Sequence, residues 1–268
     1  MKLIQSILVN NPCYKTGRKI TVKGLMLHSV GCPQPSAQVF IRNWNSASYD
    51  RACVHGFIDA NDGTVYQTLP WDHRGWHGGG SCNNTHIGIE MCEPGCIKYT
   101  AGSSFSCSDL ASARASAKRT YETAVELFAM LCKKFSLDPL ADGVIISHRE
   151  GATRGIASNH ADPEHLWNGL GMPFSMNTFR AAVAEKMKVE DENMDVNRFK
   201  ELWTEMRKEL QDNDASSYSE EARNWAVKNG IIVGGSTNEF NGMWQDILTR
   251  EQMVTVLYRF AKLLGKVK

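Results

Sequence analysis

The sequence predicts an α/β fold, in which a mixed central sheet is flanked by helices and followed by a small all-α module at the C-terminus. Short apolar runs alternate with amphipathic helical segments over residues 1–185, a pattern typical of a sheet covered by helices on both faces. Two of these runs are joined by Asn61-Asp-Gly63, which favours an antiparallel hairpin within the sheet. Beyond residue 185 the patterns are helical and rich in charge.

The strands expected in this first region are short and apolar. They run over residues 24–30, 52–59, 64–69, 87–92 and 144–147. An amphipathic helix carrying Val39, Phe40 and Trp44 follows the first strand, and a long helix over residues 109–135 precedes the last. Asp138-Pro139 ends the long helix, because the residue before a proline avoids the helical conformation.

Three regions are expected in all: residues 1–185, a charged helical connector over residues 186–214, and a small module over residues 215–268. The apolar residues of the connector form one narrow stripe: Val196, Phe199, Trp203, Met206 and Leu210. This stripe predicts a helix that either packs on a neighbour or supports a homodimer. In the module, Ser217-x-x-Glu220 and Thr249-x-x-Gln252 are capping-box signals that each predict the start of a helix.

Composition excludes several classes of protein. The 268 residues include 30 Lys and Arg against 29 Asp and Glu, and the resulting net charge of +1 argues against a dedicated nucleic-acid binder. No apolar run approaches the ~20 residues of a membrane span, so no membrane partner is expected. The first ten residues lack the sustained apolar core of a secretory signal, so we expect synthesis in a cytoplasm without a signal peptide.

All eight cysteines lie in the first half of the chain. Their even number would permit disulfide bonds, but without a secretory signal we expect reduced and mostly buried thiols. Cys92-x-x-x-Cys96 has no matching second pair, so a cysteine-rich zinc site is not expected.

Histidines and one aspartate indicate the functional site. His28 ends the first expected strand, His148 ends the last, and His160 and Asp162 follow in the next loop. Neutral imidazoles together with a carboxylate suit a catalytic Zn²⁺, which takes three protein ligands and keeps a fourth position for water. The alternative for each histidine taken alone is a hydrogen-bonded structural residue.

Glu90 places a carboxylate in the middle of an apolar strand, where an unpaired charge is costly. One interpretation is a buried salt bridge. The other is a general base whose pKa is raised by burial and which faces a metal-bound water.

Several short motifs, taken in order, resemble one enzyme family. They are Leu27-His28-Ser29, His55-Gly-Phe-Ile-Asp59, Gly63-Thr-Val-Tyr-Gln67, Trp76-His-Gly-Gly79, Asn84-x-x-Ile-Gly-Ile-Glu90, Ser147-His148 and Asp162-Pro163. Together they look like the zinc-dependent N-acetylmuramoyl-L-alanine amidases (type 2 amidases), whose fold is shared with peptidoglycan recognition proteins. The resemblance covers about residues 20–175.

The resemblance implies that Zn²⁺ is held by His28, His148 and Asp162. Active members of the family carry a carboxylate or a cysteine at the third position, so Asp162 implies an enzyme rather than a binding-only relative. Glu90 matches the residue assigned as general base. Many members have an oxyanion-stabilising lysine two residues before the third ligand. This chain departs from that pattern and has His160 there, which would stabilise the oxyanion if the ring were protonated.

The third ligand has an alternative. The segment from His148 to Asp162 is longer than in the shorter family members, so His160 is a candidate ligand that Asp162 would orient from outside. Pro163 and Trp167 keep the family register and favour Asp162 as the ligand.

The resemblance also implies substrate contacts. Trp76, His77 and Asn84 match the cleft wall of the family, and the alternative is that they only pack or hold loops. The implied partner is bacterial peptidoglycan. The implied reaction is hydrolysis of the amide bond between N-acetylmuramic acid and the L-alanine of the stem peptide.

The C-terminal module has motifs of its own, Ser219-Glu-Glu-Ala-Arg-Asn-Trp-Ala226, Gly230-Ile-Ile-Val-Gly234 and Leu248-Thr-Arg-Glu-Gln252. They look like a single S-layer-homology motif, which implies binding to a secondary cell-wall polymer of Gram-positive bacteria. Such motifs often occur in threes, so a single copy implies modest affinity or several cooperating chains. The alternative is a module that only packs against the catalytic domain.

These expectations combine into a peptidoglycan amidase with a wall-binding tail. Without a secretory signal, a phage or prophage endolysin of a Gram-positive host is favoured, made in the bacterial cytoplasm and acting at the wall after release. The alternatives are a binding-only peptidoglycan recognition protein and a bacterial autolysin or muropeptide-recycling amidase.

Overall fold

The computed structural model describes residues 1–192, 196–234 and 240–267. The chain forms two compact units, Met1–Glu190 and Asp191–Lys268. The boundaries at residues 185/186 and 214/215 stay a prediction, and helix α6 (Met176–Glu192) runs across the first of them. Within the described residues, no helix combines the length and the apolar character that crossing a membrane requires.

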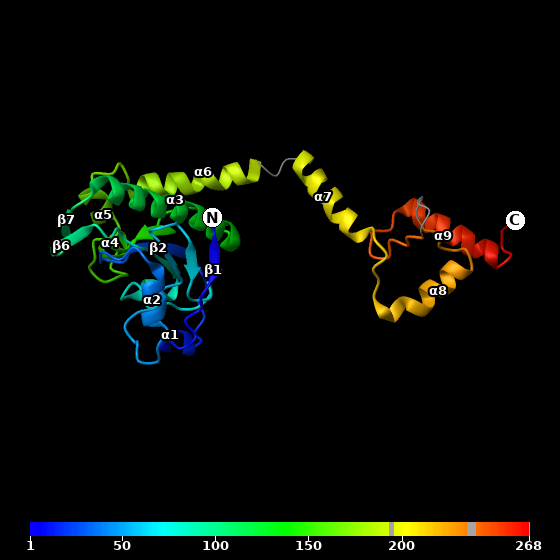
Figure 1. The fold of residues 1–268 in the computed structure, drawn as a ribbon, viewed down its shortest axis with the longest axis horizontal. Helices are drawn as coiled ribbons and strands as arrows, with labels where there is room; N and C mark the ends of the chain where they lie inside the picture. Colours follow the sequence, from blue (N-terminus) through cyan, green and yellow to red (C-terminus); the bar gives the residue numbers. More distant parts are fainter. Residues whose placement is uncertain (193–195, 235–239, 268) are drawn as a thin grey trace. The chain divides into compact units, whose positions relative to one another are not determined.

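The first unit is built on a six-stranded sheet with the strand order β1-β4-β3-β5-β2-β8 (Figure 1). Neighbouring strands are parallel except β3 and β4, which are antiparallel. The strands are β1 (Leu3–Gln5), β2 (Gly24–Ser29), β3 (Gly56–Ile58), β4 (Val65–Gln67), β5 (His86–Met91) and β8 (Ile145–Ser147). The predicted mixed α/β sheet is confirmed.

Helices cover both faces of this sheet. The side chain of Ile58 packs in a core with Phe128 and Phe179, whereas that of its neighbour Phe57 faces the opposite side and stacks on Phe40 at 5.0 Å. In Figure 1, α3 and α6 therefore lie on one side and α2 on the other. The helices of this unit besides α6 are α1 (Pro12–Lys15), α2 (Ala37–Trp44), the short η1 (Ser81–Asn84), α3 (Leu110–Phe135), α4 (His148–Thr153) and α5 (Glu164–Gly169).

The local signals explain two of the predicted elements. The long helix α3 begins at Leu110, one residue after the expected start, because the Asp109 side chain accepts a hydrogen bond from the Ser112 N–H and caps the helix. The hairpin at Asn61-Asp-Gly63 is also present and joins β3 to β4. Gly63 has a φ of 76°, a backbone conformation that favours glycine.

A second hairpin was not predicted. It consists of β6 (Ile97–Ala101) and β7 (Ser104–Cys107), which form a separate antiparallel two-stranded sheet. Its inner side chains, among them Ile97 and Phe105, pack on apolar residues of α3 and α5. The signal in the sequence is weak, because only one face of each strand is apolar and both strands are short.

The second unit contains α7 (Val196–Leu210), the short η2 (Ser217–Ser219), α8 (Glu220–Lys228) and α9 (Arg250–Leu263). Thr249 and Gln252 form both hydrogen bonds of the expected capping box at α9. The capping box expected from Ser217 is wrong, since α8 begins after Ser219 and has no side-chain cap. Asp246 joins the loop before α9 to α7 by accepting from Arg207 at 2.9 and 2.6 Å.

Candidate metal centre and active site

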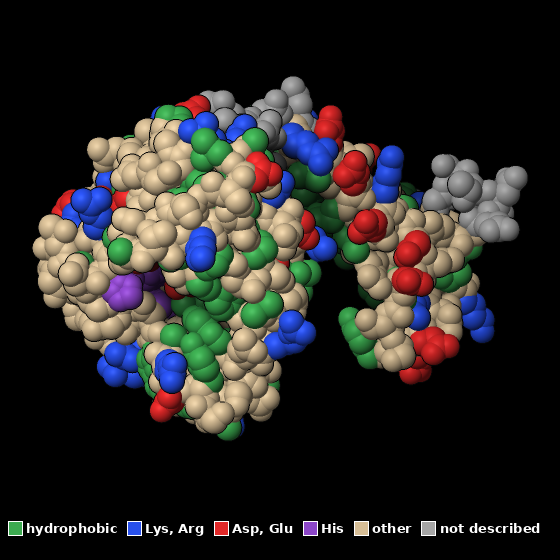
Figure 2. Space-filling model, turned by 60° about the vertical axis from the view of Figure 1, so that its left-hand side comes forward, with side chains coloured by type: hydrophobic (Ala, Val, Ile, Leu, Met, Phe, Trp, Pro, Cys, Tyr) green, Lys and Arg blue, Asp and Glu red, His purple; other side chains and the backbone are tan. Residues whose placement is uncertain are grey.

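A pocket of about 1190 Å³ opens beside the carboxyl ends of three parallel strands. His28 and Ser29 end β2, Glu90 lies near the end of β5, and His148 directly follows β8. The carboxyl ends of parallel strands are where open α/β sheets form their binding sites. Figure 2 shows histidine side chains in a hollow of this surface.

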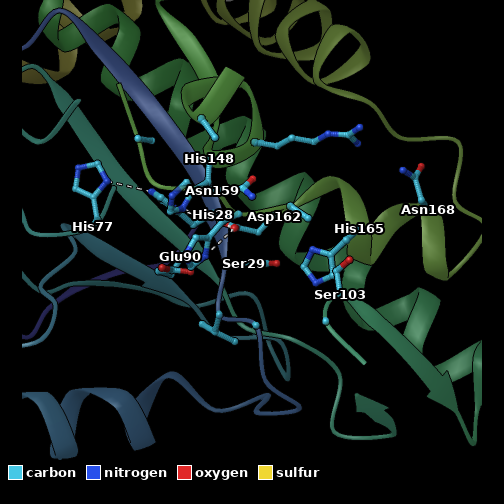
Figure 3. Close-up of a pocket in the computed structure, with 18 of the residues that line it drawn as sticks. His28, Ser29, His77, Glu90, Ser103, His148, Asn159, Asp162, His165 and Asn168 are labelled. Carbon is cyan, nitrogen blue, oxygen red and sulfur yellow. Dashed lines mark hydrogen bonds and ion pairs between the residues drawn. The ribbon is translucent and has the colours of Figure 1, made fainter. Parts of the chain in front are cut away.

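Three side chains bring donor atoms together in the pocket (Figure 3). His28 Nδ1 is 3.0 Å from His148 Nδ1 and 3.2 Å from Asp162 Oδ2. His148 Nδ1 is 3.6 Å from Asp162 Oδ1. All three side chains are buried, and their ligand atoms lie within 4.8 Å of one another. The structure thus joins residues that are 134 positions apart in the chain.

A chain of hydrogen bonds fixes the tautomer of His28. His77 Nε2 lies 3.0 Å from the backbone carbonyl of His86, which can only accept, so His77 donates from Nε2. Burial holds the pKa of His77 well below its usual value, so its Nδ1 is an acceptor for the Nε2–H of His28 at 3.0 Å. Gly88 makes room for this arrangement, because a Cβ there would collide with the His77 ring. When the ring is neutral, the Nδ1 lone pair of His28 therefore points into the centre.

His148 is fixed in the same way from another direction. Its Nε2 lies 3.1 Å from Ser158 Oγ, and that hydroxyl in turn donates to the carbonyl of Gly78 at 3.3 Å. The hydroxyl oxygen thus accepts from His148 Nε2–H, which leaves the Nδ1 lone pair of His148 facing His28. Burial lowers the pKa of His148 to about 4, so the ring is neutral at physiological pH.

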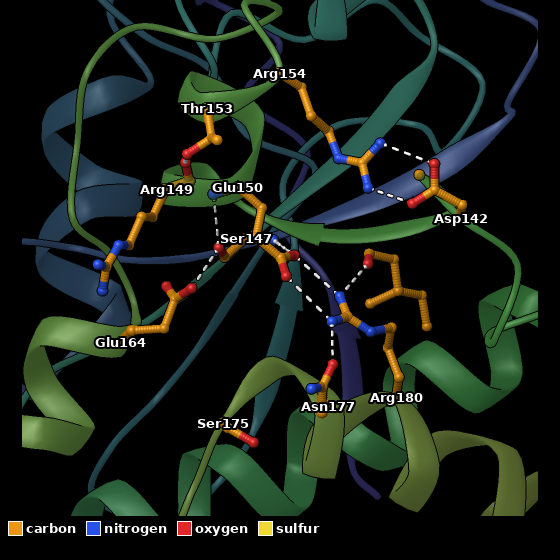
Figure 4. Close-up of polar contacts among 12 residues, drawn as sticks. Asp142, Ser147, Arg149, Glu150, Thr153, Arg154, Glu164, Ser175, Asn177 and Arg180 are labelled. Carbon is orange, nitrogen blue, oxygen red and sulfur yellow. Dashed lines mark hydrogen bonds and ion pairs between the residues drawn. The ribbon is translucent and has the colours of Figure 1, made fainter.

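The position of His148 follows from the start of α4. Ser147 and Glu150 form a capping box, which sets the first turn of this helix directly after β8. Ser147 Oγ also donates to Glu164 of α5 at 2.7 Å, and Glu150 pairs with Arg180 of α6 at 2.9 Å (Figure 4). Two neighbouring helices therefore hold the turn that carries His148.

The donor set fits a metal ion. Two imidazole nitrogens and a carboxylate converge, which is a repulsive arrangement unless a positive charge, either a metal ion or a proton on His28, lies among them. Metal–ligand bonds of about 2.0–2.2 Å in a tetrahedron place donors about 3.3–3.6 Å apart, close to the separations found. Burial opposes a charge on His28, yet Asp162 and Glu90 raise its pKa, so the potential at this point attracts a positive charge. These three residues could hold a metal ion.

Glu90 lines the same pocket and stands beside His28 in the register of β2 and β5. Its Oε2 is buried and has no hydrogen-bond partner among the described residues. Burial, opposed by His28 and assisted by Asp162, raises the pKa of Glu90 to about 7. A carboxyl with this pKa exchanges a proton readily near neutral pH. The buried salt bridge considered as an alternative is not seen among the described residues.

His160 lies at the mouth of the centre. Its ring stacks on that of His148 at a centroid distance of 4.4 Å, and its Nδ1 is 3.8 Å from Asp162 Oδ1. Its side chain is 59% exposed, whereas that of Asp162 is 9% exposed. Asp162, and not His160, shares the compact donor group with the two buried histidines.

The three expected substrate contacts lie in different places. His77 lines the pocket, but both of its ring nitrogens are engaged by His28 and the His86 carbonyl. Trp76 packs against a small apolar cluster around Leu8, outside the pocket lining. Asn84 lies on the surface and accepts from Arg74 Nε at 2.8 Å. The structure therefore brings only His77 to the pocket, where it orients His28.

Sequence reasoning missed some residues that shape the pocket. Ser158 orients His148, and Tyr99 and His165 form a polar wall with Ser103 and Asn168. Their signal in the sequence is weak. Serine is common in loops, and Tyr99 lies in the hairpin that the sequence did not predict. The cysteines stay outside the site: all eight are free, and none belongs to the donor group formed by the described residues.

Comparisons with known proteins identify the family and the fold of the chain. A family model described as N-acetylmuramoyl-L-alanine amidase matches residues 17–165, more than half of the chain. The chain resembles the Staphylococcus aureus hydrolase AmiA, solved with its ligand, at 19% identity and a TM-score of 0.55, covering 72% of this chain and 86% of that one. It also resembles a mutant endolysin from Bacillus subtilis at 20% identity and a TM-score of 0.47, covering 68% and 99%. No curated protein sequence matches the chain. The chain belongs to the N-acetylmuramoyl-L-alanine amidase family.

Proposed function

We propose that this chain is a zinc-dependent amidase that hydrolyses the bond between N-acetylmuramic acid and the L-alanine of the peptidoglycan stem peptide. The observation that carries the proposal is the convergence of His28, His148 and Asp162 beside the unpartnered carboxyl of Glu90. A binding-only protein needs neither a complete donor set nor a carboxyl with a pKa of about 7.

The roles of the residues follow from their positions. His28, His148 and Asp162 would hold Zn²⁺, which supplies Lewis acidity toward the substrate carbonyl and lowers the pKa of a water. Glu90 takes a proton on its unpartnered Oε2 and returns it to the leaving amine. His160 is exposed beside Asp162, where a protonated ring would stabilise negative charge on the carbonyl oxygen.

The test compares the wild type with a His28→Ala variant on defined muropeptides, read by mass. We expect the wild type to release a stem peptide with a free L-alanine amino group. The variant should lose its metal and fall below about one-thousandth of the wild-type rate, since such catalysis is worth several kcal/mol. His73→Ala is a matched control, because His73 contacts Asp72 outside the pocket and should not be needed. A zinc-loaded wild type that binds muropeptides without cleaving them would show a binding-only protein.

We infer that the second unit directs the enzyme to the wall of a Gram-positive host. Its pocket of about 300 Å³ is lined by residues 232–234, 242–243 and 246–248 and by one side of α9. This lining overlaps the segments resembling an S-layer-homology motif, which supports binding of a secondary cell-wall polymer. Together with the amidase unit, this arrangement suits a phage or prophage endolysin released at lysis.

Pairing of two chains through α7 would raise the avidity of a single wall-binding module. Support for this pairing comes from Phe199 and Trp203, which stack at 6.2 Å and are 58% and 42% exposed. We expect Trp203→Glu to lower the molar mass measured by light scattering and to weaken retention on purified walls. The amidase rate on soluble muropeptides should stay unchanged. A wild type that is monomeric at micromolar concentration would refute the pairing.

A further inference from the structure

Beside the metal centre, the pocket has a wall of uncharged polar groups that the proposed mechanism does not use. It is formed by Tyr99 of β6, Ser103 in the turn between β6 and β7, and His165 and Asn168 of α5. Figure 3 labels His165, Ser103 and Asn168 among the side chains that line the pocket. The wall therefore combines the unpredicted hairpin with α5.

A buried carboxylate organises this wall from behind. Glu93 is fully buried, and its Oε1 accepts from the backbone N–H of Gly31 at 3.1 Å. Its Oε2 accepts from the hydroxyl of Tyr99 at 2.7 Å. The Tyr99 oxygen lies 2.6 Å from His165 Nε2. Because the phenolic proton is given to Glu93, the phenolic oxygen is left to accept from Nε2–H of His165.

This network assigns the tautomer of His165. Burial lowers the pKa of His165 against the opposing effects of Asp162 and the Ala161 carbonyl, so the ring is neutral and, beside the Tyr99 oxygen, carries its single N–H on Nε2. Burial and the Glu93 carboxylate raise the pKa of Tyr99, so the phenol keeps its proton. The Nδ1 of His165 is therefore a bare acceptor.

That acceptor is buried and unsatisfied. The His165 side chain is 9% exposed, and its Nδ1 has no hydrogen-bond partner among the described residues. The residue nevertheless lines the pocket. A buried acceptor beside a binding pocket, held in one tautomer by neighbours, is arranged to receive a donor from a ligand.

We propose that Nδ1 of His165 accepts a hydrogen bond from an N–H or O–H group of the bound substrate and so contributes to specificity. The inference rests on the proposed function, because the substrate is a muropeptide whose reacting bond lies at the metal centre. Two sources of the donor are available in such a substrate: a backbone amide of the stem peptide and a hydroxyl of the sugar. A site built to hydrogen-bond a substrate group rejects analogues that lack it, since its own polar group is then left unpaired.

The experiment uses the parent N-acetylmuramoyl-tripeptide and two sets of analogues. In one set a single peptide N–H is replaced by N-methyl, and in the other a single sugar hydroxyl is replaced by hydrogen. We expect one analogue to lose about tenfold or more in kcat/KM with the wild type, mostly through KM. With His165→Phe, kcat/KM for the parent should fall by a similar factor. For that analogue, kcat/KM should stay at the value it has with the wild type.

Two variants separate this contact from a structural role. His165→Asn places a carbonyl oxygen near the position of Nδ1 and should restore part of the preference, which a loss of packing would not allow. Tyr99→Phe removes the acceptor for Nε2–H, releases the tautomer, and should weaken the same preference less than His165→Phe does. Thermal unfolding of each variant checks that it folds.

Binding in a Glu90→Gln background keeps the two proposals separable, because calorimetry then measures the affinity without turnover. If every analogue lost the same affinity relative to the parent whether residue 165 is His or Phe, the proposed contact would be overturned. A preference for analogues that keep an acceptor, rather than a donor, would overturn the assigned tautomer and the contact with it. Donor-dependent binding without any cleavage by the wild type would leave the contact standing and refute the amidase proposal.

Discussion

Glu90 lies near the end of β5 and lines the pocket, whereas Glu93, three residues further along the chain, is buried behind the pocket wall. Burial raises the pKa of both. Glu93 accepts hydrogen bonds from Gly31 and Tyr99, whereas Oε2 of Glu90 has no partner among the described residues. A buried carboxylate supplied with donors orients its neighbours, while one without donors is disposed to take up a proton. Hydrogen-bond supply, and not burial, distinguishes the two.

The same contrast separates the two parts of the pocket. Around Glu90 the side chains of His28, His148 and Asp162 present lone pairs to a common point, as a cation requires. Beside Glu93 the wall groups are uncharged, Tyr99 and His165 are hydrogen-bonded to each other, and Nδ1 of His165 has no partner among the described residues. We therefore expect chemistry at the first part and recognition at the second.

The largest effect should come from Glu90→Gln. Removing the proton acceptor should lower kcat by about 10²–10⁴-fold, the range for general-base catalysis, and leave the metal content unchanged. The measurement is the initial rate on defined muropeptides together with metal analysis of the dialysed protein.

Glu93→Gln is the matched comparison, with the same chemical change three residues away. It should raise KM through the Tyr99–His165 wall and lower the free energy of unfolding by about 1–3 kcal/mol, with kcat little affected. If both variants lost kcat equally, the contrast between the two carboxylates would be refuted.

A smaller effect is expected from Ser158→Ala. The hydroxyl of Ser158 orients His148, and loss of such an outer hydrogen bond costs about 10–100-fold in metal affinity. Competition with a chelator measures that affinity. Ser103→Ala, on the hairpin part of the pocket, should bind the metal as the wild type does. An unchanged affinity in Ser158→Ala would show that the Ser158 hydroxyl is not needed to hold the ring of His148.

The smallest effect should be the dependence of the rate on pH. Glu90 acts as a base only when it is deprotonated, so activity should fall as pH is lowered through its pKa. That pKa is about 7 without a cation, and a bound cation lowers it, so the acidic limb should lie at or below about pH 7. Below its midpoint, kcat/KM should fall about tenfold per pH unit. Metal content measured at each pH tests whether loss of the ion, through protonation of His28, is the cause instead.

Much of the fold could be predicted, since each predicted element has a local cause. The Asn61-Asp-Gly63 turn, the cap at Asp109 and the apolar runs of β2 and β5 act over a few residues, so the sequence displays them. The hairpin of β6 and β7 escaped prediction because its packing on α3 and α5, rather than its own pattern, stabilises it.

The site was predictable in part. Residues that match a family motif, such as His28, His148, Asp162 and Glu90, were found because the type of side chain reveals the chemistry. Trp76 and Asn84 match the motif equally well, yet they lie outside the pocket lining. Motif membership does not tell a side chain that contacts substrate from one that packs or holds a loop.

The sequence by itself determined the α/β fold class, the family, and the residue types available for a metal and a base. The tertiary structure decided what the individual side chains do. His77 orients His28 rather than contacting substrate, Ser158 orients His148, and Glu93 orients Tyr99. The physical reason is that tautomers, burial and unpaired acceptors depend on neighbours tens of residues away in the chain. No local pattern encodes those neighbours.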